Sequence, residues 1–170
     1  MIPVVTTDRL TLRAPEQRDF ETYAAFRASD RAKTVGGPFP RSHAFQSFCA
    51  IIGHWTMRGY GRWIVADKTT DEPVGLVGIF YPEDWPEPEV AWSMFANGEG
   101  KGYACEAAKA AREWAYETLG WNRLVSMVDP TNTRSVALAK RLGCTPGGTF
   151  THETLGELHY WVHPGPEAAR

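Results

Sequence analysis

The sequence predicts a single α/β domain, and three observations lead to this prediction. The chain has 170 residues, the length of one domain. Hydrophobic residues make up 43% of the chain and charged residues 22%, as in ordinary folded proteins. Strand and helix patterns follow one another in the order β-α-α-β-β-β-α-β-α-β-β, with no internal repeat or linker. Residues 1–170 are therefore expected to form one domain.

The first part of the chain predicts one strand followed by two helices. Residues 9–13 alternate polar and apolar side chains, as a half-buried strand does. Asp19 is a typical helix-capping residue, and the spacing after it predicts a helix to about Asp30. Glycine and proline predict a loop over 35–40, and a second helix is expected over 41–57. The expected buried face of this second helix consists of Phe45, Phe48, Cys49, Ile52 and Trp55.

The rest of the chain predicts strands interrupted by two helices. A polar turn between residues 62–67 and 73–81 predicts an antiparallel hairpin, and the proline-rich segment 82–88 predicts a loop. The remaining expected elements are a strand over 89–95, a helix over 103–119, a strand over 124–128, a helix over 133–142 and two strands within 150–162.

Composition argues against several classes of protein. The net charge is −2 and neither half has a basic excess, so binding to nucleic-acid phosphates is not expected. No apolar run approaches the roughly 18 residues of a membrane span, and the first residues lack a signal-peptide pattern. The five histidines form no metal-binding pair, so no metal is expected. Three scattered cysteines favour a reducing, cytoplasmic location.

The segment 89–108 combines a strand, a glycine-rich turn and the start of a helix. This order directs backbone N–H groups and the positive end of a helix dipole at one spot, which suits a phosphate. A P-loop requires Ser or Thr after its lysine, but Lys101 is followed by Gly102. The glycine spacing also fails the dinucleotide-binding pattern. A turn that merely caps the helix remains the alternative interpretation.

Three motifs in the chain resemble the GNAT acetyltransferase superfamily. Residues 100–107, Gly-Lys-Gly-Tyr-Ala-Cys-Glu-Ala, resemble its acetyl-CoA loop, with Asn97 where Gln or Arg is usual. Residues 7–13 and 130–143 resemble the opening strand and the Asn-x-x-Ser helix of the ribosomal-protein N-terminal acetyltransferases, the RimJ/RimL type. The motifs keep the family's order and cover nearly the whole chain. The resemblance implies a single mixed, mostly antiparallel sheet flanked by helices.

The resemblance also implies acetyl-CoA as the co-substrate. The groups expected to hold it are the backbone N–H groups of Gly100, Lys101, Gly102, Tyr103 and Ala104, the backbone near Met94 and Phe95, and the side chain of Asn132. The strands over 89–95 and 124–128 would splay apart and admit the pantetheine arm between them. Backbone N–H groups there would polarise the thioester. Lys140 and Arg141 would either meet the adenosine 3′-phosphate or form a solvated helix face.

Acetyl transfer to an amine requires a neutral nucleophile and hence favours a general base. At pH 7 an α-amino group is neutral about one time in seven, but a lysine amine only about once in 2,500. Glu89 matches the glutamate common at this strand position in the family and is the first candidate, acting directly or through a water. The alternative is that Glu89 faces solvent after Pro88. Glu153 and His152 are the other candidate bases.

The expected general acid is less well defined by the sequence. Many superfamily members carry a Tyr on the helix after the Asn motif, but Ala139 occupies that position. Ser135 is the remaining candidate, and its alternative role is a hydrogen bond to nearby backbone. Cys105 lies beside the expected acetyl-CoA loop and is either an acyl relay or an ordinary packing residue.

The loop before the strand at 89–95 carries acidic and aromatic residues. Trp85 with Glu83, Asp84 and Glu87 is hypothesised to form one wall of a site for a cationic amine, or else the loop is exposed with a packed Trp. The sequence thus predicts an N-acetyltransferase that acts by direct attack in a ternary complex. The acceptor would be a protein N-terminus or a small-molecule amine, and the enzyme a monomer or homodimer. A non-catalytic acyl-CoA sensor and a nucleotide-binding protein are the rival functions.

Overall fold

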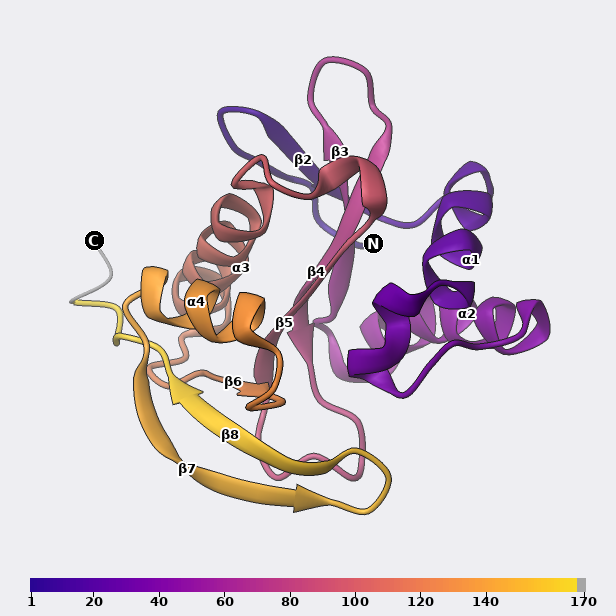
Figure 1. The fold of residues 1–170 in the computed structure, drawn as a ribbon. Coiled ribbons are helices and arrows are strands. Elements are labelled where there is room, and N and C mark those ends of the chain that lie inside the picture. The colour runs from indigo at the N-terminus through magenta and orange to yellow at the C-terminus, as the bar shows by residue number, and fades with distance from the viewer. Residues whose placement is uncertain (168–170) are drawn as a thin grey trace.

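One eight-stranded sheet organises the chain, in a computed structural model that describes residues 1–167 (Figure 1). The strands are β1 (Val5–Thr6), β2 (Leu10–Arg13), β3 (Arg62–Asp67), β4 (Pro73–Phe80), β5 (Glu89–Met94), β6 (Val125–Val128), β7 (Thr145–His152) and β8 (Gly156–Val162). The helices are α1 (Phe20–Ala28), α2 (Arg41–Arg58), α3 (Tyr103–Leu119) and α4 (Thr133–Arg141), with short 3₁₀ turns η1 (Gln17–Asp19), η2 (Asp30–Val35) and η3 (Ala96–Gly98). The predicted order of the principal elements is confirmed.

The sheet is mixed and mostly antiparallel, as predicted. Its strand order is β1-β2-β3-β4-β5-β6-β8-β7, and among these neighbours only β5 and β6 run parallel. These two strands pair at a single register position, Glu89 opposite Val125. Beyond that position they diverge, so the sheet opens in its middle at the end of β5.

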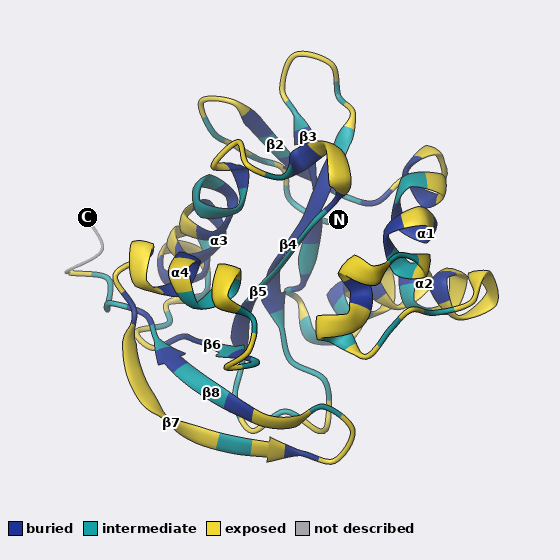
Figure 2. Cartoon of the chain, viewed as in Figure 1, coloured by how far each residue is buried: buried dark blue, intermediate teal, exposed yellow. Residues whose placement is uncertain are grey.

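Helices cover both faces of the sheet. Successive side chains of a strand point to opposite faces. Ile64 and Leu76 therefore pack beneath α1 and α2, whereas Trp63, Val65 and Val77 pack toward α3. Figure 2 shows this buried centre and the largely exposed β7 at the sheet edge. In the described residues no helix has both the length and the apolar content to cross a membrane.

The predicted buried face of α2 is partly wrong. Phe45 and Ile52 are 49% and 45% exposed, and Cys49 is also exposed. The side chains that face the core are Ala44, Phe48, Ile51 and Trp55. Their spacing of four, three and four residues follows one helix face closely. The prediction favoured large apolar residues, but the smaller Ala44 fits the close approach of α2 to α1.

Asp19 is the N-cap residue of α1, as predicted, but its side chain makes no capping hydrogen bond to that helix. Its carboxylate is fully buried and accepts two hydrogen bonds from Arg13, at 2.8 and 2.9 Å, and one from the Glu16 N–H. The first helix ends at Ala28, and a 3₁₀ turn follows it. Burying a carboxylate without a charged partner costs more free energy than leaving a helix uncapped. The tertiary contact with Arg13 therefore decides the role of this side chain.

The first strand of the C-terminal hairpin begins earlier than predicted. β7 starts at Thr145 and contains Pro146, Gly147 and Gly148, a composition that usually marks a turn. The pairing with β8 shifts register between Pro146 and Gly148. Because β7 is the edge strand, a residue without an N–H group is tolerated there.

Candidate active site

The glycine-rich turn leaves the N-terminus of α3 open. Gly100 and Gly102 adopt left-handed backbone conformations, with φ of 73° and 76°, and no atom lies within 4 Å of a Cβ built on Gly100. No side chain caps the helix. The Glu106 N–H bonds to the Gly102 carbonyl at 3.3 Å, and the N–H groups before it have no partner one helical turn back. The turn thus offers backbone donors and space to an anion.

Arg9 braces this turn, a role that the sequence did not reveal. Its Nη1 donates to the Lys101 carbonyl at 2.9 Å, and its Nε donates to Glu106 at 2.7 Å. The Thr7 hydroxyl donates to the other Glu106 oxygen at 2.6 Å. The segment before β2 is therefore tied to the first turn of α3. Nearly a hundred residues separate these partners, so local patterns could not connect them.

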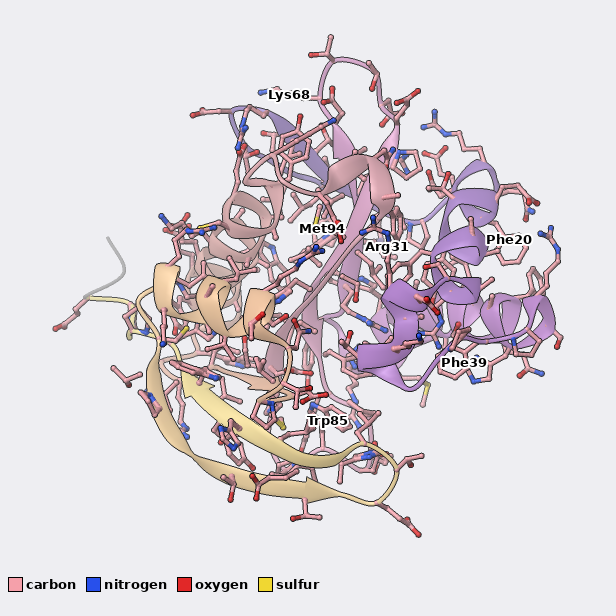
Figure 3. All side chains as sticks on the ribbon, in the orientation of Figure 1. Phe20, Arg31, Phe39, Lys68, Trp85 and Met94 are labelled. Atoms are coloured by element: carbon pink, nitrogen blue, oxygen red, sulfur yellow. The ribbon has the colours of Figure 1, made fainter. Side chains whose placement is uncertain are left out.

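Two further arginines meet in front of the turn at Glu99. Arg31 from η2 and Arg134 from α4 both form ion pairs with the Glu99 carboxylate, the latter at 3.1 Å. Figure 3 shows Arg31 near Met94, over the end of β5. Positive charge thus lies close to the turn although the whole chain has no basic excess. Lys140 and Arg141 are likewise exposed, at the end of α4.

The open side of β5 begins where it leaves β6. Phe95 gives its N–H to the Val74 carbonyl, and its own carbonyl accepts from the Gly98 N–H, each at 2.9 Å. The Phe95 N–H is therefore not free for a ligand, and its carbonyl already accepts one hydrogen bond. Because backbone groups of successive strand residues point to opposite sides, those of Met94 face the gap between β5 and β6. Met94 keeps its expected position.

Glu89 lies buried at the junction of β5 and β6, so the solvent-facing alternative is wrong. It is 5% exposed and lines a cavity. The Trp85 indole N–H donates to Oε1 at 2.9 Å, and the Met127 N–H donates to Oε2 at 2.7 Å. Burial raises the pKa of Glu89 to about 7, against the lowering effects of these two hydrogen bonds and of the nearby Arg62 charge. A carboxyl group with this pKa exchanges protons readily at neutral pH.

Asn132 and Ser135 face the same cavity from the start of α4. The Asn132 side-chain oxygen accepts the Ser135 N–H at 3.1 Å and thereby caps the helix. Its side-chain amide nitrogen makes no hydrogen bond with the described residues. The Ser135 hydroxyl accepts the Trp92 indole N–H at 3.1 Å, which leaves its own proton free to donate. The alternative in which this hydroxyl satisfies local backbone is not what the structure shows.

The other two candidate bases are poorly placed. Both nitrogens of His152 are engaged, because Nδ1 accepts the Thr154 and Leu155 N–H groups at 3.1 Å and Nε2 lies 2.8 Å from Asp84. This pattern leaves no lone pair for a substrate proton. Glu153 is exposed and does not line the cavity.

The loop wall predicted from the sequence is only partly present. Trp85 and Asp84 line the cavity. The Trp85 ring meets the His152 ring edge to face, with 4.9 Å between the ring centroids, beside the β7–β8 hairpin (Figure 3). The Glu83 side chain is 95% exposed and pairs with an arginine at the end of α2. Its inclusion in the wall was therefore wrong. Glu87 likewise forms its ion pair outside the cavity.

Comparison with known proteins decides the family. The family model described as "Acetyltransferase (GNAT) domain" matches residues 9–145. The chain belongs to the GNAT acetyltransferase family. An acetyltransferase from Agrobacterium tumefaciens str. C58 has a similar structure, with a TM-score of 0.88 and 39% identity over 96% of this chain and 95% of that one.

Two further proteins to which the chain is similar share less sequence identity with it. N-acetyltransferase p20 of Bacillus licheniformis, itself uncharacterised, is 26% identical over 140 residues, 80% of this chain and 79% of that protein. The ribosomal L7/L12 acetyltransferase RimL, solved in complex with coenzyme A, has a TM-score of 0.75 at 15% identity, over 95% of this chain and 98% of that one. At this low identity the likeness to RimL shows a shared fold alone.

The remaining residues of interest in this GNAT chain lie away from the cavity. Cys105 is half-buried on α3 and does not line it. Burial raises the pKa of Cys144 to about 11, which keeps that thiol protonated and unreactive. Within residues 1–167, no group of three His, Cys, Asp or Glu side chains is arranged to hold a metal ion.

Proposed function

We propose that this GNAT acetyltransferase transfers the acetyl group of acetyl-CoA to a primary amine by direct attack in a ternary complex, with Glu89 as the general base. The observation that carries the proposal is a buried carboxyl of pKa about 7 at the point where β5 and β6 part. A perturbed carboxyl that lines a cavity is a common signature of acid–base chemistry.

The residues of this chain fit acetyl-CoA. The open N-terminus of α3, with space over Gly100, suits the pyrophosphate, and the N–H groups of Gly100, Lys101, Gly102, Tyr103 and Ala104 would hold it. The free backbone of Met94 and the Asn132 amide nitrogen would bind the pantetheine arm. Arg134 would turn from Glu99 toward the phosphates. When bound, acetyl-CoA supplies the activated thioester.

The proton transfers follow from the geometry of the site. Glu89, ionised in about half of the molecules at pH 7, takes a proton from the acceptor ammonium directly or through a water. The neutral nitrogen forms a bond to the acetyl carbon, the carbon–sulfur bond breaks, and the nitrogen gives up its second proton to solvent as the amide forms. The Ser135 hydroxyl donates a hydrogen bond to the departing sulfur, which takes its proton from solvent or through Ser135. Backbone N–H groups of β5 polarise the carbonyl oxygen.

A thiol-release assay tests this proposal. Purified protein is mixed with acetyl-CoA and a panel of amino acids, polyamines, aminoglycosides and N-terminal peptides, and free CoA is measured together with the acetylated product. We expect stoichiometric CoA and N-acetyl product with at least one class of amine. Calorimetric binding of acetyl-CoA without turnover of any amine would instead indicate an acyl-CoA sensor.

A further inference from the structure

Two arginines in the cavity have no carboxylate partner. Arg27 on α1 and Arg62 at the start of β3 are half-buried and line the cavity that Glu89 lines. Among residues 1–167, no carboxylate oxygen lies within the 4.0 Å of an ion pair from either guanidinium. Most other arginines of the described residues pair with a carboxylate, as Arg41 does with Glu21, and the buried Arg112 instead donates to the Leu142 carbonyl. Unmatched cations in a cavity therefore need another explanation.

Aromatic rings hold both guanidinium groups in place. The Arg27 guanidinium carbon lies 3.9 Å from the centre of the Phe39 ring, and that of Arg62 lies 4.1 Å from the centre of the Phe80 ring. Stacking fixes the plane of a guanidinium and leaves its N–H edge free. The buried Nε of Arg27 has no hydrogen-bond partner in the described chain. Both guanidinium groups thus line the cavity, and Arg27 carries an unsatisfied donor.

Three carboxylates, Asp84, Glu89 and Asp129, also line the cavity, but none of them forms an ion pair with Arg27 or Arg62. Burial lowers the pKa of both arginines, and at Arg62 the nearby Glu89 charge opposes this effect whereas the Arg27 charge adds to it. On the acidic side, Glu89 is only about half-ionised at neutral pH. The Asp84 carboxylate already forms a hydrogen bond with His152 Nε2. Half-buried cations without an ion-pair partner in contact destabilise a fold unless a ligand compensates them.

We propose that the acceptor is a free amino acid, a small amine whose carboxylate binds Arg27 and Arg62 while its amine reaches Glu89. Two planar guanidinium groups match a carboxylate by paired, charge-assisted hydrogen bonds. The cavity, of about 660 Å³, is otherwise walled by residues such as Phe26, Leu155 and Leu158, which favours an apolar side chain on the acceptor. This inference rests on the proposed function and narrows its substrate class. It replaces the cationic acceptor hypothesised from the acidic loop.

Matched acceptors and matched variants test the assignment. The acceptors are phenylalanine, leucine and methionine, each compared with its amide, which lacks only the carboxylate. The variants are R27Q and R62Q, with R62K as a charge-conserving change. R41Q is the control, because Arg41 also stacks on an aromatic ring, Phe20 at 4.8 Å, but lies outside the cavity. The ratio of kcat/KM between acid and amide is compared across variants, so that the different pKa values of the two amines cancel.

We expect the wild type and R41Q to share one acid-to-amide ratio. R27Q and R62Q should lower this ratio about 10- to 100-fold, the effect of a charged hydrogen bond, and R62K should restore part of it. Without ligand, R27Q and R62Q should unfold at the same temperature as wild type or higher, because each removes an uncompensated cation. An unchanged ratio in both Gln variants, or a lower melting temperature in both, would overturn the anion site.

Two further results separate this inference from the proposed function. Better turnover of peptides with an acidic second residue than of free amino acids would keep the anionic chemistry but overturn the small-molecule assignment. If no amine releases CoA, the proposed function fails. In that case the amino-acid site is judged by quenching of tryptophan fluorescence on titration with phenylalanine. Saturable quenching that R27Q and R62Q weaken would support the site, and its absence would overturn it.

Discussion

Glu89 links burial, charge and reaction at the scale of one residue. Two hydrogen bonds orient its carboxylate, and burial keeps its proton affinity far above that of a surface glutamate. A base of pKa about 7 is matched to neutral pH, because it is both substantially ionised and able to hold the transferred proton. Burial of Glu89 therefore costs folding free energy but gives its carboxyl group the pKa that a general base requires at neutral pH.

The substitution E89Q tests this role directly. In the wild type, kcat/KM should fall below pH 7 as Glu89 protonates, in addition to any fall caused by the acceptor amine. In E89Q we expect kcat/KM to drop about 10²- to 10⁴-fold and the limb near pH 7 to disappear, leaving that of the amine. E153Q serves as the control, because Glu153 is exposed outside the cavity. A pH–rate profile of each protein is the measurement, and an E89Q profile parallel to wild type would refute the assignment.

At the scale of elements, the start of α3 and the splay of β5 from β6 together shape the proposed acetyl-CoA site. Gly100 and Gly120 stand at opposite ends of α3, both with left-handed φ, and both have no atom within 4 Å of an added Cβ. They therefore form a matched pair of positions, of which only Gly100 faces the proposed phosphate site.

We expect G100A and G120A to lose similar stability, about 1–2 kcal/mol for an L side chain in the left-handed region. Only G100A should weaken acetyl-CoA binding, by about tenfold or more, because its methyl group occupies the approach of the phosphate to the backbone. Chemical denaturation and calorimetry with acetyl-CoA measure the two effects. Equal acetyl-CoA affinity in both variants would show that the glycine-rich turn only connects β5 to α3 and does not bind the phosphates.

The elements themselves could be predicted from the sequence more fully than the contacts between them. The strand at β5 and the helix at α3 follow from periodicity and glycine, which are local signals. Arg9 and Glu106, or Arg27 and Phe39, come together only through the tertiary fold. No local pattern distinguishes an arginine that lacks a counterion from one that has it. The candidate base was predicted, but the charge of its cavity was not.

At the scale of the whole molecule, two buried groups make opposite contributions to stability. His163 is 4% exposed, with Nε2 at 2.9 Å from the Ser126 hydroxyl, which in turn donates to the Val90 carbonyl at 2.6 Å. This network joins β6 to β5 just beyond their one paired position. Burial lowers the pKa of His163 to about 3, with the Arg112 charge as a second cause. Burial also lowers the pKa of His54, whereas it raises that of Glu89.

These directions fix the sign of each contribution. Between about pH 3 and 6.5 the unfolded chain binds the His163 proton and the folded chain does not, so stability rises with pH. Between about pH 4.5 and 7 the folded chain binds the Glu89 proton and the unfolded chain does not, so stability falls with pH. Each slope is about 1.4 kcal/mol per pH unit, and the two offset one another where the windows overlap.

A substitution of either residue should reveal the pH dependence that the other residue contributes to stability. Relative to wild type, E89Q should gain about 1.4 kcal/mol of unfolding free energy per pH unit as pH rises from 4.5 to 7. H163Q, whose amide can replace the Nε2 donor, should instead lose stability relative to wild type as pH rises from 4.5 to 6.5. H159Q, which removes a half-exposed imidazole on β8, is the control for replacing a histidine by glutamine. Urea denaturation at half-unit pH steps measures the slopes, which do not depend on any constant offset from altered packing. If the unfolding free energy of E89Q changes with pH as steeply as that of wild type, Glu89 titrates like a surface carboxyl. That result would contradict its assignment as the general base.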